Sequence, residues 1–143
     1  MANEEVFTFG RLVRRSRSCG NFGLFANAVE HGNLNMSYDE KTKFIIENRL
    51  NSEVENLLSL REHREKFVQV NFRRQPDRIV VTVEDMGRGF DFEKYLRLDD
   101  TRVFHNHGRG IALIHSIYPL RYLGRGNKVV VEIPLMKVAV GYN

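Results

Sequence analysis

Apolar and polar residues alternate along several stretches of the chain, and this alternation predicts strands. Residues 67–72 and 78–84 alternate most clearly, and the Gln-Pro-Asp sequence at residues 75–77 is typical of a turn between them. The pattern therefore predicts an antiparallel hairpin. Residues 6–9 fit a short edge strand, and residues 120–133 fit a second hairpin with a glycine-rich turn.

Apolar residues recur at helical spacing in two other stretches. Between residues 24 and 30 they form one stripe, and we expect this helix to end at Gly32, a natural C-terminal cap. A second apolar helix is predicted over residues 111–118, and it must end before Pro119, which cannot continue a helix. Residues 92–98 fit a shorter helix.

The segment between the first helix and the first hairpin is rich in charged residues. Ser37 and Ser52 are each followed three residues later by a glutamate, a capping-box pattern that predicts two helix starts. In the first of these helices we expect Phe44 and Ile45 to point inward. Because both helices are highly charged, they are predicted to lie on the surface as a helical insertion at about residues 34–65.

Helices and antiparallel hairpins in mixed order predict an α+β fold, a two-layer α/β sandwich with a mixed, mostly antiparallel sheet. One face of the sheet would pack on the two apolar helices. The other face would meet solvent, because Gln69, Asn71 and Thr82 alternate with apolar residues. The length predicts a single domain over residues 1–143, with a core that spans residues 24–133.

The composition, with 42% apolar and 28% charged residues, is that of a soluble globular protein. No apolar run approaches the ~20 residues needed to span a bilayer, so no membrane association is expected. The acidic start, Met-Ala-Asn-Glu-Glu, lacks the order of a secretory signal. A single cysteine, Cys19, rules out an internal disulfide and fits a reducing compartment. We therefore expect a cytoplasmic protein.

A net charge of +4 and a pI near 9.4 raise the question of nucleic acid binding. Arginines gather at residues 11–17, 73–74 and 121–125. No aromatic-rich RNA-binding strand or zinc-finger spacing accompanies them, so nucleic acid is not expected to be the main partner.

Three short motifs carry candidate chemistry. Asn27 opens the first, Asn-Ala-Val-Glu-His-Gly-Asn, and a helical asparagine offers an oxygen that Mg²⁺ accepts beside phosphate oxygens and water. Asp85 opens the second, Asp-Met-Gly-Arg-Gly-Phe-Asp, where a carboxylate at a strand end could accept a hydrogen bond from an adenine amino group. The third, His-Gly-Arg-Gly-Ile at residues 107–111, would present backbone N–H groups at a helix start to phosphates. Together they describe a purine nucleotide site, although each alone also fits an ordinary turn or cap.

In their order, and in the element on which each lies, these motifs resemble the nucleotide-binding boxes of the superfamily that groups DNA gyrase, the heat-shock chaperone ATPases and the histidine kinases, the Bergerat fold. The first motif and the short lid at residues 91–107 most resemble the anti-sigma-factor serine kinases. The insertion at residues 34–65 resembles the branch attached to bacterial response regulators. The resemblance covers residues 24–133 and implies a domain that binds ATP and Mg²⁺ in bacterial signal transduction.

The resemblance also implies roles for individual residues. Asn27 would bind Mg²⁺, and Asp85 would hold the adenine amino group. The further ATP-binding positions that it implies are His31, Gly87, Gly89, Gly108, Arg109 and Gly110. His31 and Asn33 fit equally well as cap and loop residues, and Thr82 is either a water-mediated partner of adenine or an exposed strand residue.

One departure from the family concerns catalysis. The active kinases and ATPases carry a glutamate as general base four residues before the asparagine, and in this chain Gly23 stands there. Glu30 is a poor substitute because the family also carries it. The resemblance therefore implies Mg-ATP binding with weak or no phosphotransfer. The alternatives are an active serine/threonine kinase or ATPase with another base, and a protein-interaction module that binds no nucleotide.

A regulatory protein partner is a further implication of the resemblance. Such a partner would be of the sigma-factor, anti-anti-sigma or response-regulator type. Anti-sigma kinases also often pair as homodimers, although no stretch of the sequence identifies such an interface.

Overall fold

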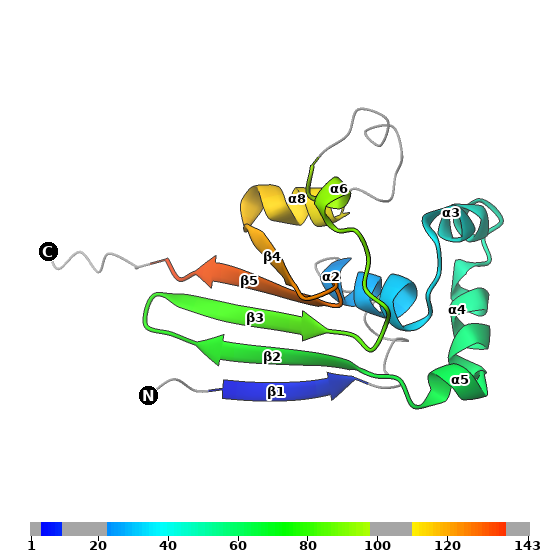
Figure 1. Ribbon diagram of the computed structural model, residues 1–143, viewed down its shortest axis with the longest axis horizontal. Coiled ribbons are helices and arrows are strands. Elements are labelled where there is room, and N and C mark those ends of the chain that lie inside the picture. Colours follow the sequence, from blue (N-terminus) through cyan, green and yellow to red (C-terminus); the bar gives the residue numbers. More distant parts are fainter. Residues whose placement is uncertain (1–3, 10–22, 98–109, 137–143) are drawn as a thin grey trace, which may run out of the picture.

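The computed structural model describes residues 4–9, 23–97 and 110–136 (Figure 1). Five strands form one sheet in the order β1-β2-β3-β5-β4. The predicted α+β class is confirmed, and the described strands pair antiparallel throughout, without the mixed pairing that was expected. The strands are Glu4–Phe9 (β1), Val68–Arg74 (β2), Arg78–Glu84 (β3), Leu120–Leu123 (β4) and Lys128–Pro134 (β5).

Both predicted hairpins are confirmed. β2 and β3 pair with Val70 opposite Val83, and Gln75 N donates a 2.8 Å hydrogen bond to Arg78 O across the turn between them. β4 and β5 form the second hairpin. β1 pairs with β2 as the predicted edge strand and starts slightly earlier than expected, at Glu4.

The two predicted apolar helices are also present, as α2 (Gly23–Asn27) and α8 (Gly110–Ile117). The predicted shorter helix is α6 (Glu93–Leu96). Pro119 follows α8 as expected, and β4 begins directly after it. Across the described ranges, no helix has both the length and the apolar character that a membrane span requires.

The prediction that the first helix ends at Gly32 is wrong. α2 continues without a break into a wider π-helix, η1 (Ala28–Asn33), in which Leu34 N donates to Val29 O at 2.9 Å. Gly32 lies inside η1 and does not adopt the positive φ of a glycine cap. Its lack of a side chain is required for a different reason, the close approach of Asp85.

The core lies between the helices and one face of the sheet. In the central strands β2, β3 and β5, alternate residues on this face include six buried valines, and α2, η1 and α8 pack against them. The opposite face carries Asn71 and Thr82 side by side in the register, both half-buried, as the predicted solvent face requires. The principal core residues are Val68, Val70, Val81, Val83, Val129 and Val131 from the strands and Phe25, Ala28, Val29 and Ile111 from the helices.

The predicted helical insertion consists of α3 (Tyr38–Ile46), α4 (Leu50–Ser59) and α5 (Arg61–Arg64). In Figure 1 these helices stand beside the end of the sheet where β2 begins and β3 ends. Val54, which is 2% exposed, holds the insertion to the core.

The local details of the insertion are confirmed only in part. The capping box at Ser37 is present, because Glu40 N donates to Ser37 Oγ at 3.1 Å and Ser37 N donates to Glu40 Oε2 at 2.8 Å. The box predicted at Ser52 is wrong: α4 begins at Leu50, and Ser52 Oγ instead donates to Arg49 O at 2.9 Å. Phe44 is half-buried as expected, whereas Ile45 is 39% exposed and does not point inward.

Candidate functional site

Asp85 follows the last residue of β3 and continues its alternation, so it falls on the same side of the sheet as Val83 and the helices. Its main chain is held on both sides by Asn127. Asp85 N donates to Asn127 O at 2.9 Å, and Asn127 Nδ2 donates to Asp85 O at 3.0 Å. The end of β3 is thereby fixed to the start of β5.

The carboxylate of Asp85 is half-buried and only partly satisfied. Gly87 N donates to Oδ1 at 2.8 Å, whereas Oδ2 accepts no hydrogen bond from any described residue. Burial raises the pKa of Asp85 to about 6, against the opposing effects of the Gly87 N–H and the Arg125 guanidinium. Asp85 therefore has one oxygen available for a donor outside the described chain, and it is mostly ionised at pH 7.

Gly32 and Gly87 allow η1 and the turn after β3 to approach Asp85. A Cβ on Gly32 would overlap the carboxyl carbon of Asp85 and lie 2.5 Å from Oδ2. A Cβ on Gly87 would overlap Gly32 O and lie 2.8 Å from Asp85 Oδ1. The predicted role of Gly87 was approach to a nucleotide, and the described packing supplies a steric requirement within the chain itself.

Gly89 has a similar internal requirement. Its φ is +81°, which disfavours a side chain, and an added Cβ would overlap Arg125 O. Phe90 N donates to the same carbonyl at 3.0 Å, and Arg125 Nη2 donates to Gly87 O at 3.0 Å. The loop after β3 is therefore laid directly on the turn between β4 and β5.

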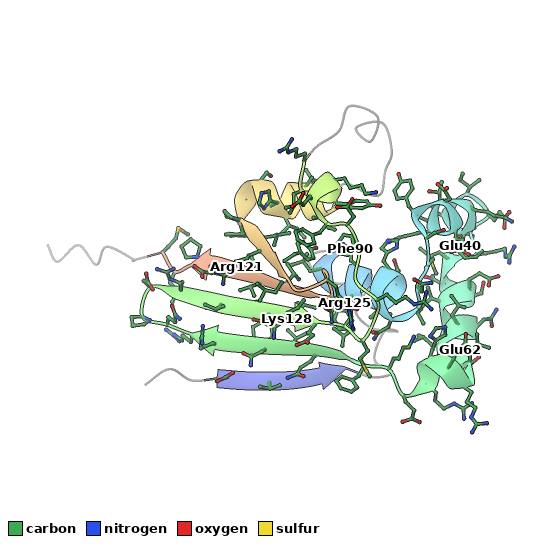
Figure 2. The ribbon with its side chains drawn as sticks, in the orientation of Figure 1. Glu40, Glu62, Phe90, Arg121, Arg125 and Lys128 are labelled. Atoms are coloured by element: carbon green, nitrogen blue, oxygen red, sulfur yellow. The ribbon has the colours of Figure 1, made fainter. Side chains whose placement is uncertain are left out.

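Aromatic rings hold the next part of this loop against β4. Phe90, labelled in Figure 2, meets Tyr122 edge-on at 5.3 Å between ring centroids. Phe92 stacks on Tyr122 at 4.9 Å. Burial raises the pKa of Tyr122, and the neighbouring carboxylate of Asp85 adds to this shift. Of the predicted lid, residues 91–97 are described, and the remainder lies outside the described residues.

Asn27 is the last residue of α2, half-buried, and its side-chain amide makes no hydrogen bond within the described ranges. The helix that carries it contacts both of the elements that carry the other motifs. At its start, a Cβ on Gly23 would lie 3.5 Å from Ile114 Cδ1 in α8. Toward its other end, Gly32 lies against Asp85. The α2–η1 helix is thus the common neighbour of β3 and α8.

His31 and Asn33 both have structural partners. Nδ1 of His31 lies 2.6 Å from Met36 O, and burial lowers the pKa of His31, so the neutral ring donates its Nδ1 proton to this carbonyl. Asn33 is buried and bridges two segments, because its Nδ2 donates to Phe67 O at 2.9 Å and its Oδ1 accepts from Met86 N at 2.7 Å. The cap-and-loop alternative therefore describes the contacts of both residues.

No described residue near Asn27 stands out as a general base. Gly23 has no side chain, and the start of α2 leaves ordinary van der Waals room for one. Glu30 is buried and forms an ion pair with Lys41 Nζ at 2.5 Å, which commits its carboxylate to holding α3 on η1. Gly110 is exposed at the first position of α8, while Gly108 and Arg109 lie outside the described residues.

Thr82 cannot be the predicted partner of adenine beside Asp85. Thr82 pairs with Asn71 and Val130, and these residues lie on the sheet face that the helices do not cover. Asp85 continues the alternation of Val81 and Val83, which lie on the face covered by the helices. Strand alternation separates an even-numbered from an odd-numbered position across the thickness of the sheet. Thr82 is therefore a strand residue on the open face, as its alternative interpretation expected, although its side chain is half-buried rather than exposed.

Sequence reasoning did not identify the residues that hold Asp85 in place. Asn127, Arg125 and Tyr122 all lie on the β4–β5 hairpin, whose glycine-rich turn was interpreted only as a turn. The sequence signal that could have identified Asn127 is its position directly after Gly126, where a polar residue precedes an apolar strand. Pairing of this strand with β3 brings it beside Asp85.

Comparisons with known proteins give no assignment: no protein-family model matches the chain, and no curated protein matches it. Within the described parts of the chain, no cluster of three or more histidine, cysteine, aspartate or glutamate side chains is arranged to hold a metal ion. A hard cation would therefore have to take most of its ligands from elsewhere, as Mg²⁺ does when phosphates and waters supply them.

Proposed function

We propose that this chain is a Mg-ATP-binding regulatory domain of the Bergerat type, similar to the anti-sigma-factor serine kinases and acting in bacterial signal transduction in the cytoplasm. The observation that carries the proposal is the position of the α2–η1 helix. It bears Asn27 and contacts Asp85 of the second motif and Ile114 of α8, the helix that the third motif opens, so elements far apart in sequence meet at one helix.

The state of Asp85 supports a role in binding the adenine base. A half-buried carboxylate with a raised pKa and an oxygen without a described donor costs stability unless a ligand satisfies it. An exocyclic amino group is a suitable donor, because a hydrogen bond to an ionised acceptor is roughly twice as strong as a neutral one. The Asn127 bonds hold Asp85 rigidly enough for such recognition.

Two further features support the metal and phosphate ends of the site. The half-buried amide of Asn27, which makes no hydrogen bond within the described ranges, can supply one oxygen ligand to Mg²⁺, with phosphates and waters as the others. Gly110 opens α8, a helix whose first N–H groups favour an anion. Arg109, directly before it in the sequence, would add positive charge.

Binding without efficient turnover is the expected outcome. The base position is Gly23, and Glu30 is held by Lys41. A bound nucleotide would then act as a conformational or recognition signal to a protein partner of the sigma-factor, anti-anti-sigma or response-regulator type.

Titration calorimetry with Mg²⁺ and a non-hydrolysable ATP analogue tests this proposal. Asp85→Asn should weaken binding by at least about tenfold, since the amide cannot replace the charge-assisted hydrogen bond. Asp77→Asn, an exposed aspartate in the β2–β3 turn, is the matched control and should bind as the unaltered chain does. Absence of binding in the unaltered chain, or equal affinity in Asp85→Asn, would contradict the proposal.

A further inference from the structure

A cavity lies between the helical insertion and the loop after β3, with a volume of about 700 Å³. We call it the side cavity. The insertion side contributes Leu57, His63 and Lys66, and the loop and hairpin contribute Met86, Arg88 and Arg125. Figure 2 shows Arg125 at the end of the sheet nearest the insertion, with Glu62 on α5 beyond it. Asp85 does not line this cavity.

Positive charge dominates the side cavity. Among the described residues that line it, Lys66, Arg88 and Arg125 face a single carboxylate, that of Glu62, which leaves a net charge of two positive. His63 lies between two of these groups: Lys66 Nζ is 3.3 Å from its Nδ1, and Glu62 Oε1 is 3.4 Å from its Nε2.

Two of the three cations are held in place by the main chain. Arg125 Nη2 donates to Gly87 O at 3.0 Å, and Lys66 Nζ donates to Asn33 O at 2.9 Å. Arg88 makes no hydrogen bond or ion pair with any described residue, so its guanidinium group is available to a ligand. A cavity with fixed cations and one available guanidinium group is organised in advance for an anion.

We propose that the side cavity binds a small organic phosphate, a phosphomonoester with an apolar body, at a site separate from Asp85. A phosphomonoester carries nearly two negative charges at pH 7, which matches the net charge of the cavity. Arginine and lysine together provide the donors that its oxygens require. The volume is in the range of small-molecule sites and exceeds what a bare phosphate fills, and Leu57 and Met86 offer apolar contact to the remainder.

This proposal does not depend on nucleotide binding at Asp85. Gly32 and Gly87 line the side cavity and also lie against Asp85, so their main chain is the wall between the two sites. A ligand in the side cavity would contact the outer side of this wall and Arg125.

Phenyl phosphate is a suitable probe, followed by NMR titration of the full chain with phenol and inorganic phosphate as comparisons. Phenyl phosphate should bind at least several-fold more tightly than inorganic phosphate, and phenol should not bind. Arg88→Gln should weaken phenyl phosphate binding about tenfold, because it removes a charge-assisted contact. Arg121→Gln is the control, since Arg121 is an exposed arginine on β4 that lies farther from the insertion (Figure 2). Equal binding of phenol, or unchanged affinity in Arg88→Gln, would overturn the proposal.

The same titration in the presence of Mg²⁺ and the ATP analogue distinguishes the two sites. If the sites are separate, Asp85→Asn should leave phenyl phosphate binding unchanged, and the analogue should not displace the probe. Displacement by the analogue together with loss of probe binding in Asp85→Asn would make the cavity part of one nucleotide site and overturn the proposal. If the analogue fails to bind while phenyl phosphate binds and responds to Arg88→Gln, the nucleotide proposal fails and the side cavity proposal stands.

Discussion

The carboxylate of Asp85 lies directly against the α-carbon of Gly32, with no room for a methyl group between them. Gly32 belongs to η1, which continues the helix of Asn27, and Asp85 follows β3. The contact therefore fixes the position of the helix of the first motif relative to the strand end of the second. A side chain at Gly32 or Gly87 would push η1 away from the turn after β3.

Gly32→Ala should accordingly destabilise the fold by about 1–3 kcal/mol, because overpacking against Asp85 must move η1 or the carboxylate. Urea denaturation gives the free energy of unfolding. Gly23→Ala is the matched control: its Cβ would make an ordinary 3.5 Å contact with Ile114, and the helix start should gain up to about 1 kcal/mol. Equal stability of the two variants would show that η1 can move away from Asp85 at little cost.

Asp85→Asn should stabilise the unliganded protein at pH 8 while it weakens nucleotide binding. The unfolded chain ionises Asp85 near 3.8 and the folded chain near 6, so the folded state holds this proton more tightly. The corresponding stability is fully present below pH 3.8 and is lost as the pH rises through 6. Two pKa units correspond to ~3 kcal/mol, which solvent screening of a half-exposed group reduces to about 1 kcal/mol.

The measurement for this variant is urea denaturation at pH 4 and at pH 8. The advantage of Asp85→Asn should be about 1 kcal/mol at pH 8 and close to zero at pH 4, where the native aspartate is protonated. The asparagine can keep the hydrogen bond from Gly87 N, so packing is preserved. A variant less stable than the unaltered protein at both pH values would mean that the ionised carboxylate serves the fold.

Two glycines with positive φ should respond very differently to alanine. Gly124 has a φ of +59° and open space around it, so Gly124→Ala should lower the free energy of unfolding by only about 1 kcal/mol. Gly89 has a φ of +81°, and a Cβ there would also overlap Arg125 O. Gly89→Ala should therefore lower the free energy of unfolding by more than about 3 kcal/mol. Thermal unfolding of the two variants tests the difference. Similar midpoints would indicate that the loop after β3 is not held on the β4–β5 turn.

Gly23→Glu tests the explanation for weak catalysis. A glutamate one turn before Asn27 would restore the missing proton acceptor, and phosphate release or transfer from labelled ATP should rise about 10²-fold or more. Gly23→Gln has nearly the same shape without the basicity and should remain at the original rate. Fast turnover in the unaltered chain would refute the view that Gly23 limits the chemistry.

Local patterns were sufficient to predict most of the described elements. The alternation of the β2–β3 hairpin and the capping box at Ser37 depend on residues close in sequence, and both were predicted correctly. Ser52 has the same capping-box sequence, yet α4 begins before it at Leu50. Packing of the insertion, with Val54 in the core, decides which helix start is used.

The surroundings of Asp85 depend on contacts that no local pattern reveals. Asn127 lies 42 positions away in sequence, and the π-helical segment at Gly32 lies against the carboxylate of Asp85, which is likewise too distant along the chain for any local pattern. Periodicity predicted an ordinary α-helix there because 3.6-residue spacing cannot report a single widened turn. The motif chemistry could be predicted from residue types, whereas the hydrogen bonds that hold it required tertiary structure.

Asn33 has a consequence for the order in which the chain folds. Its two side-chain hydrogen bonds join η1 to residues 34 and 53 positions away, at the start of β2 and at the turn after β3. Such contacts form only once the helix docks on a completed hairpin, so they belong late on the folding pathway. Asn33→Ala should therefore accelerate unfolding and leave the refolding rate nearly unchanged in stopped-flow experiments. Asn33 would therefore slow the unfolding step in which the helix of Asn27 separates from the end of β3, next to Asp85.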